Sequence, residues 1–159
     1  MSWTRTCSER GAADPATLRA KALDLLARRE HSRLELRQKL VQRGFATSDI
    51  EPVLDALAAE GLLDERRYAE LYACSRADKG YGPLRIAREL RERGIPDALT
   101  EAAIAALDDF WMPKLRELHR KRFKSQMPAH AADRMQQSRV LRQHGFTLDQ
   151  IRHLFEPLT

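Results

Sequence analysis

The sequence predicts an all-α protein in which three tandem three-helix repeats stack into an elongated, curved array. Of its 159 residues 43% are apolar but only 6% are aromatic, a balance that suits helices packed through Leu and Ala better than a β-sandwich. A glycine followed by an apolar residue recurs at intervals of 50 and 51 residues, at Gly44-Phe45, Gly94-Ile95 and Gly145-Phe146. This pair is typical of the Schellman motif, which ends a helix.

The residues around each glycine repeat as well. A leucine lies four residues before each of these glycines, and an apolar residue lies ten residues before it. Twelve residues before each glycine is a residue suited to open a helix, namely Ser32, Gly82 and Asp133. The apolar residues ten before are Leu34, Leu84 and Met135. After each glycine, eleven of twelve compared positions are apolar, ending at Leu158, with the i, i+3, i+4, i+7 spacing of an amphipathic helix. A unit of this size needs stacked neighbours to bury its core, as in other repeat proteins.

The first repeat is expected to span residues 14–62, after a disordered tail over residues 1–13 that lacks the apolar segment of a signal peptide. Asp14-Pro15 begins the first helix, because Asp caps a helix and Pro suits its first turn. The sequence predicts two capping boxes, Ser32 with Glu35 and Ser48 with Glu51. In a capping box a Ser and a Glu three residues later satisfy backbone N–H groups at the start of a helix.

The second repeat is expected to span residues 63–110 and the third residues 111–159. Between two helices of the second repeat, Gly80 and Gly82 flank Tyr81 and interrupt the helical pattern. Pro83 then begins a helix whose core side chains are predicted to be Leu84, Ile86, Ala87 and Leu90. In the third repeat a basic helix ends before Met127-Pro128, and Asp133 is expected to cap the next helix.

The positive charge is concentrated at the C-terminal end. The chain has 28 Lys and Arg against 23 Asp and Glu, a net charge of +5. Residues 111–159 hold 10 of these basic and 4 of these acidic side chains, so that this segment carries +6 and the rest carries −1. Such an asymmetry indicates an acidic partner such as nucleic acid or an acidic protein surface, although a solvated surface is the simpler interpretation.

Nothing in the sequence indicates a catalytic or cofactor site, and we expect no enzyme activity and no cofactor. None of the five histidines has a metal-ligand spacing to Cys, Asp or Glu, and His119 and His130 are expected to be solvated. Gly80-Tyr81-Gly82 lacks the Gly-Lys-Ser/Thr of a phosphate loop. The two cysteines, Cys7 and Cys74, predict no disulfide framework, and no segment is long and apolar enough for a membrane span.

Two basic clusters are candidate sites for a partner or for DNA. They comprise Lys79, Tyr81, Arg85 and Arg88 near the glycine-rich break, with Tyr81 exposed enough to stack, and Lys114, Arg116, Arg120, Lys121, Arg122 and Lys124 after it. Phosphate contacts from such residues would bind single- or double-stranded DNA without sequence preference and with strong salt dependence. The alternative is a stand-alone helical DNA-binding protein such as a transcription regulator, which the basic excess after residue 110 supports. The last two helices of each unit could form a helix-turn-helix, but nothing in them indicates base readout.

Three stretches of the sequence resemble the signatures of the RecX recombination regulators. The first contains Ala27-Arg28-Arg29-Glu30-His31-Ser32, Glu35-Leu36 and Lys39-Leu40. The second contains Gly61-Leu62-Leu63-Asp64 and Arg67-Tyr68-Ala69. The third and most specific contains Ser75-Arg76, Lys79-Gly80-Tyr81-Gly82-Pro83, Ile86, Glu89-Leu90 and Gly94-Ile95. The resemblance covers roughly residues 18–158, and it is weakest in the third repeat.

The resemblance implies a bacterial cytoplasmic protein, monomeric and without enzyme activity, that regulates recombination and DNA repair. RecX-like proteins are built from three-helix repeats, lie in the helical groove of the RecA recombinase filament and mostly inhibit its extension, ATP hydrolysis and strand exchange. Many also bind DNA. The resemblance therefore implies a RecA filament as the partner of this chain, with DNA as a second one.

Overall fold

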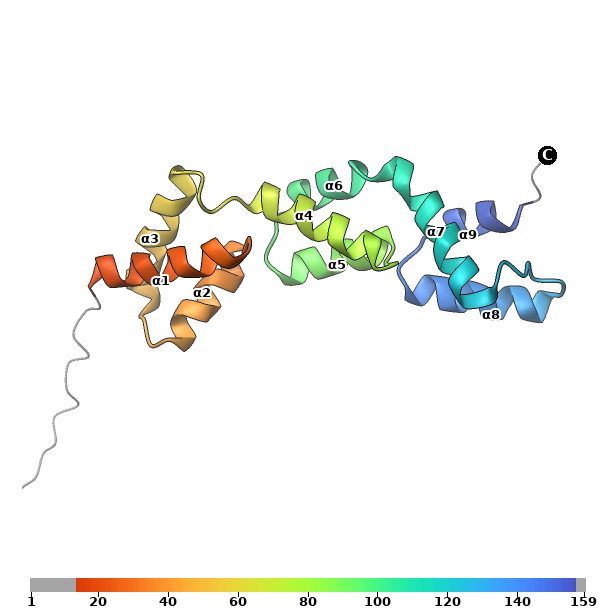
Figure 1. The fold of residues 1–159 in the computed structure, drawn as a ribbon, viewed down its shortest axis with the longest axis horizontal. Coiled ribbons are helices and arrows are strands. Elements are labelled where there is room, and N and C mark those ends of the chain that lie inside the picture. Colours follow the sequence, from red (N-terminus) through yellow and green to blue (C-terminus); the bar gives the residue numbers. More distant parts are fainter. Residues whose placement is uncertain (1–13, 157–159) are drawn as a thin grey trace, which may run out of the picture. The chain divides into compact units, whose positions relative to one another are not determined.

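The computed structural model describes residues 14–156, which form nine α-helices and contain no strand (Figure 1). The predicted all-α class is therefore confirmed. The helices are α1 (Pro15–Arg28), α2 (Arg33–Gln42), α3 (Thr47–Ala59), α4 (Glu65–Asp78), α5 (Pro83–Glu92), α6 (Asp97–Ala105), α7 (Asp108–Phe123), α8 (Ala131–Gln143) and α9 (Leu148–Phe155). The predicted tail, with Cys7, and the predicted apolar Leu158 lie outside the described residues.

The described residues divide into two compact units, residues 14–64 and 65–156. In the first unit α1, α2 and α3 pack against one another around a core of leucines and Ile50. Leu18, Leu36, Leu40, Leu54 and Leu57 in this core are completely buried, as their amphipathic spacing predicts.

The second unit contains the other six helices in two groups of three, α4–α6 and α7–α9. Helix α7 also packs against α4, and one continuous core runs through both groups. Trp111 and Leu115 of α7 are buried in this core together with Ile86, Leu90 and Phe146. The second and third groups of helices therefore share a core, whereas α1–α3 have their own.

The three glycine stops are confirmed as Schellman motifs. The backbone φ angles of Gly44, Gly94 and Gly145 are 92°, 78° and 99°, in the left-handed region that favours glycine. In each motif the residue after the glycine donates its N–H to the carbonyl of the leucine four residues before the glycine. Ile95, for example, donates to the Leu90 carbonyl at 3.1 Å.

Two of the predicted helix caps are wrong. Helix α2 begins with the expected capping box of Ser32 and Glu35, but α3 begins after Ala46, two residues earlier than a Ser48 cap requires, without a side-chain cap. Glu51 cannot complete a box with Ser48, because its carboxylate accepts hydrogen bonds from Arg33 and Arg37 of α2. Helix α8 likewise begins after His130, which places Asp133 in its first turn.

The apolar position ten residues before each stop does not belong to the core. Leu84 is 59% exposed and Met135 is 75% exposed, while Leu34 is half-buried. The prediction that Leu84 is a core residue is therefore wrong, although Ile86 and Leu90 on the same helix are completely buried. The apolar residue recurs in each repeat, but in the second and third repeats it faces solvent.

His31 is expected to make the first unit less stable in mild acid. Its buried ring donates from Nδ1 to the Arg29 carbonyl at 3.0 Å, which leaves Nε2 to accept from the Lys39 ammonium group at 3.0 Å. Burial and the neighbouring Arg29 and Lys39 lower the pKa of His31 below its usual 6.5, although the Arg29 carbonyl favours the charged form. Below pH 6.5 the unfolded chain therefore binds a proton at His31 that the folded chain does not bind, and the free energy of unfolding decreases.

The measurement is amide hydrogen exchange of α1–α3 in the full chain between pH 7.5 and 5.5, a window above the titration of the carboxylates. Protection should decrease with falling pH in the parent and should vary less in His31→Gln, which cannot be protonated. Equal slopes in the two proteins would contradict this role of His31.

Candidate partner-binding surface

The glycine-rich break between α4 and α5 is a contact between two repeats of the second unit. The N–H of Gly82 donates to the His144 carbonyl at 2.8 Å, and the N–H of Leu84 donates to the Gly145 carbonyl at 2.9 Å. The first N–H groups of a helix have no partner within the helix. Here two N–H groups at the start of α5 bind the carbonyl groups that the end of α8 leaves free, so the two helix ends complete each other.

The two glycines at this contact allow the backbones to approach closely. A Cβ at Gly82 would lie 2.5 Å from the backbone of Gly145, and a Cβ at Gly145 would lie 2.7 Å from the Arg85 nitrogen and closer still to the Arg85 Cβ. Gly82 has an ordinary φ of −90°. Its role is therefore to make room for the backbone at Gly145, and not only to break a helix as the sequence suggested.

Tyr81 is not the free stacking platform that the sequence predicted. Its half-buried ring stacks on the ring of His144 with centroids 5.8 Å apart. The guanidinium carbons of Arg76 and Arg85 lie 3.9 and 4.2 Å from the Tyr81 centroid, in cation–π contact. The prediction is wrong because α8, far away in the sequence, supplies the stacking partner.

Glu89 of α5 binds the two arginines that contact Tyr81. Its carboxylate accepts from the Tyr72 hydroxyl at 2.7 Å, from Arg76 at 2.7 and 2.8 Å and from Arg85 at 3.0 Å, and only 8% of Glu89 is exposed. Burial alone would raise the pKa of Glu89, but these hydrogen bonds outweigh it and lower the pKa to about 2. Arg85, predicted as a partner-binding residue, therefore has a structural role as well.

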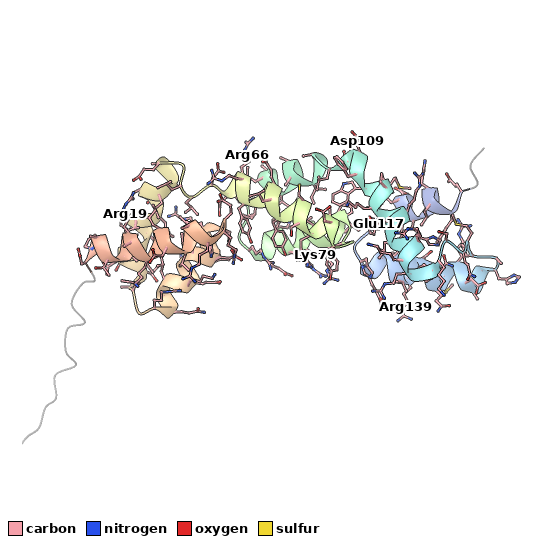
Figure 2. All side chains as sticks on the ribbon, viewed as in Figure 1. Arg19, Arg66, Lys79, Asp109, Glu117 and Arg139 are labelled. Carbon is pink, nitrogen blue, oxygen red and sulfur yellow. The ribbon has the colours of Figure 1, made fainter. Side chains whose placement is uncertain are left out.

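The other two basic residues of the first predicted cluster are exposed. Lys79 lies at the end of α4 (Figure 2) and makes no ion pair with any described residue. Arg88 lies 3.6 Å from Glu92 one turn along α5, and both side chains are more than 60% exposed. Exposed pairs of this kind contribute little to stability, so Arg88 remains available to a partner.

The six residues of the second predicted basic cluster, five in α7 and Lys124 directly after it, do not share one face. Lys114 donates to Asp78 of α4 at 2.8 Å and Lys121 pairs with Glu117 at 2.7 Å, whereas Arg122 reaches Nε2 of His144 at 3.5 Å. Burial and the positive charges of Arg122 and Arg85 lower the pKa of His144. Thus three of the six residues are engaged within the chain.

Arg116, Arg120 and Lys124 remain, and we call them the α7 basic stripe. Arg116 and Arg120 are one helical turn apart on α7, and Lys124, four residues further, is the left-handed residue that ends the helix. All three are exposed, and none of them has an ion pair with a described residue. The stripe lies away from the face of α7 that buries Trp111 and Leu115. It is the part of the predicted basic run that is free to bind an anion.

His119 was expected to be solvated, and this prediction is wrong. Only 3% of His119 is exposed, and its Nε2 lies 2.9 Å from the amide oxygen of Gln137 on α8. The Gln137 amide in turn donates to the Gln126 carbonyl at 3.0 Å. His119 follows Leu115 by four residues, so it lies on the buried face of α7. Its helical spacing was the sequence signal that could have revealed this.

Sequence reasoning missed three residues that organise the site. Arg76 of α4 and His144 at the end of α8 contact the Tyr81 ring, and Glu89 of α5 binds Arg76. Two signals pointed to them: Arg76 and Glu89 belong to the third RecX-like stretch, and Glu89 is a charged residue at a core-facing position, directly before the buried Leu90.

The described residues, 14–156, contain no group of three or more His, Cys, Asp or Glu side chains placed to hold a metal ion. Cys74 is a free, exposed thiol. No helix among these residues has the length and apolar composition required to cross a lipid bilayer.

Comparison with known proteins identifies the family. Residues 19–57 match the model of the first three-helix domain of RecX, and residues 64–104 match the model of its second three-helix domain. The Regulatory protein RecX of Halorhodospira halophila is 46% identical over 145 residues, which cover 91% of this chain and 89% of that protein. The chain belongs to the RecX family.

Other RecX proteins agree in sequence and in fold. The Regulatory protein RecX of Pseudomonas syringae pv. tomato is 45% identical over 140 residues, covering 88% of this chain and 90% of that protein. The crystal structure of RecX from Lactobacillus salivarius matches with a TM-score of 0.78 at 23% identity, over 91% of this chain and 96% of that one. The similarity to that RecX structure is one of fold.

Proposed function

We propose that this RecX family member binds the filament of the RecA recombinase, in its helical groove, and limits its extension, ATP hydrolysis and strand exchange in recombination and DNA repair. The observation that carries the proposal is the 46% identity to a protein named Regulatory protein RecX over almost the whole of both chains. Regulation of a filament requires no catalytic group on the regulator. We further expect the protein to act as a monomer in the cytoplasm.

The α7 basic stripe, together with Lys79 and Arg88, supports the proposal. A RecA filament on DNA presents phosphate groups and protein carboxylates, and exposed guanidinium and ammonium groups bind both. Lys114, Lys121 and Arg122 already have partners within the chain, so we assign them a smaller share of the binding. Arg85 and Tyr81 are expected to act mainly by shaping this surface.

Adding the protein to RecA on single-stranded DNA is expected to slow ATP hydrolysis in a saturable way. Changing Arg116 and Arg120 together to Ala should raise the concentration needed for half-inhibition by about tenfold, as expected for the loss of two charge-assisted contacts. The control variant changes Lys21 and Arg66 to Ala, which are also exposed and form no ion pair with a described residue. Unchanged ATP hydrolysis at saturating protein would refute the proposal.

DNA binding by the protein alone is tested separately, by fluorescence anisotropy with single- and double-stranded oligonucleotides of varied sequence. We expect weak binding without sequence preference that decreases steeply as salt increases, because phosphate contacts release counterions. A strong preference for one sequence would instead favour the stand-alone DNA-binding protein.

A further inference from the structure

A groove with an unusual lining lies between α8 and α9. It has a volume of about 670 Å³ and is open to solvent. Its apolar lining includes Met135, Leu148, Ile151 and Phe155, and the first two of these are 75% and 49% exposed. The exposed apolar residue that recurs ten positions before each helix stop therefore contributes here to a groove.

The same groove occurs in the preceding repeat. Between α5 and α6 lies a smaller groove of about 230 Å³, and seven of its nine lining residues precede a residue of the α8–α9 groove by 51 positions. The equivalent pairs are Pro83 and Arg134, Leu84 and Met135, Ala87 and Ser138, Arg91 and Arg142, Thr100 and Ile151, Glu101 and Arg152, and Ile104 and Phe155. The groove is thus a feature of the three-helix unit, and its lining can be compared position by position.

The two grooves differ in charge. The α5–α6 groove has mixed charges, because Arg91 is accompanied by Glu101 and Asp108 and pairs with Asp97 at 2.7 Å. Four arginines line the α8–α9 groove, namely Arg134, Arg139, Arg142 and Arg152, and its lining contains no carboxylate. At Arg152 the charge is the reverse of that at the equivalent Glu101.

Most of this positive charge is free. Arg152 lies 3.3 Å from Asp149, but Arg139 and Arg142 have no ion pair with a described residue. The guanidinium carbon of Arg134 lies 5.5 Å from the centroid of the Phe155 ring. Arg139 projects outward from α8 (Figure 2) and, like the other three arginines, is exposed. The groove therefore combines an apolar floor with a rim of exposed guanidinium groups.

We propose that the α8–α9 groove binds an acidic amphipathic segment of a partner protein. Apolar side chains on one face of such a segment would cover Met135 and Leu148, and its carboxylates would pair with Arg139 and Arg142, which offer planar groups suited to bidentate binding. A nucleic acid fits less well, because the aliphatic floor would remain uncovered and the Phe155 ring is already in contact with Arg134. None of the residues of the α7 basic stripe lines this groove.

The test uses the full chain and a short fluorescein-labelled peptide with leucines at i, i+3, i+4 and i+7 and glutamates at the remaining positions. Fluorescence anisotropy is expected to show saturable binding, whereas a peptide with lysines in place of the glutamates should not bind. Arg139→Ala combined with Arg142→Ala should weaken binding about tenfold or more, and Met135→Ser should weaken it independently. The four arginines and Met135 are exposed, so circular dichroism should confirm that these variants keep their helices.

The repeat supplies a matched control, Arg91→Ala, at the position equivalent to Arg142 in the α5–α6 groove; it should leave peptide binding unchanged. Three results would overturn the proposal. The acidic peptide fails to bind, it binds the arginine variants as well as the parent, or single-stranded oligo(dT) displaces it and depends on the same arginines. RecA is absent from this assay, so its outcome is independent of the proposed function.

Discussion

Gly145→Ala is expected to destabilise the protein by about 3 kcal/mol or more, far beyond the cost of the same substitution at Gly44. Both glycines end a helix with nearly equal positive φ angles, 99° and 92°, and each substitution should cost about 1 kcal/mol for a left-handed alanine. A Cβ at Gly44 would have no atom within 4 Å, whereas a Cβ at Gly145 would collide with the backbone of Arg85. Overpacking of this kind adds about 1–3 kcal/mol.

The measurement is urea unfolding of the full-length variants, in which the difference between Gly145→Ala and Gly44→Ala isolates the collision. Gly82→Ala provides a second test without strain in φ, because Gly82 has a φ of −90° but its Cβ would lie 2.5 Å from Gly145. The Gly82→Ala variant should therefore be destabilised by the steric clash with Gly145 alone. Similar losses at Gly44 and Gly145 would mean that the α5–α8 contact contributes little to stability.

Glu89→Gln is expected to cost about 3 kcal/mol, because removing one partner of a buried charged cluster leaves the others uncompensated. An amide cannot neutralise the guanidinium groups of Arg76 and Arg85, and its NH₂ group would face donors that now bind the carboxylate. Urea unfolding measures the loss. The matched control on the same helix is Glu92→Gln, whose exposed pair with Arg88 should contribute almost nothing.

The pH dependence of stability provides an independent check on Glu89. Its pKa is about 2 in the folded protein, against 4.5 as the ordinary value. Between these values the unfolded chain binds a proton that the folded chain does not, so the contribution of Glu89 is complete above pH 4.5 and is lost as the pH falls towards 2. Glu89→Gln should therefore show a shallower loss of stability in this range. An identical acid transition in variant and parent would contradict the buried cluster.

Local rules accounted for the helices and their ends. The Schellman motifs at Gly44, Gly94 and Gly145 were predicted from the glycine and the apolar residue after it, because that motif depends on neighbouring residues alone. The buried positions Ile50, Leu54 and Leu57 followed from helical spacing in the same way. Predictions failed where a residue distant in the sequence binds a group that a local rule had assigned to its neighbours. Arg33 and Arg37, for example, bind the Glu51 carboxylate that was expected to cap α3.

The candidate site was less predictable. The basic residues could be listed from the sequence, but their availability could not. Lys114 is paired with Asp78, 36 residues away, while Arg120 on the same helix is free. Tyr81 stacks on His144 and so cannot offer that face to a base. In each case the partner belongs to another helix, and one sequence carries no information on which distant side chains will meet.

On its own, the sequence determined the helical class, the period of the repeat and the resemblance to RecX, because these depend on spacing along the chain. The tertiary structure decided which cations remain free, why Gly82 and Gly145 lack side chains and where Glu89 finds its three hydrogen-bond donors. It also showed that an apolar position repeated in the sequence lines a groove instead of a core. Periodicity places a residue on a face of its helix, but only packing between helices determines whether that face is covered.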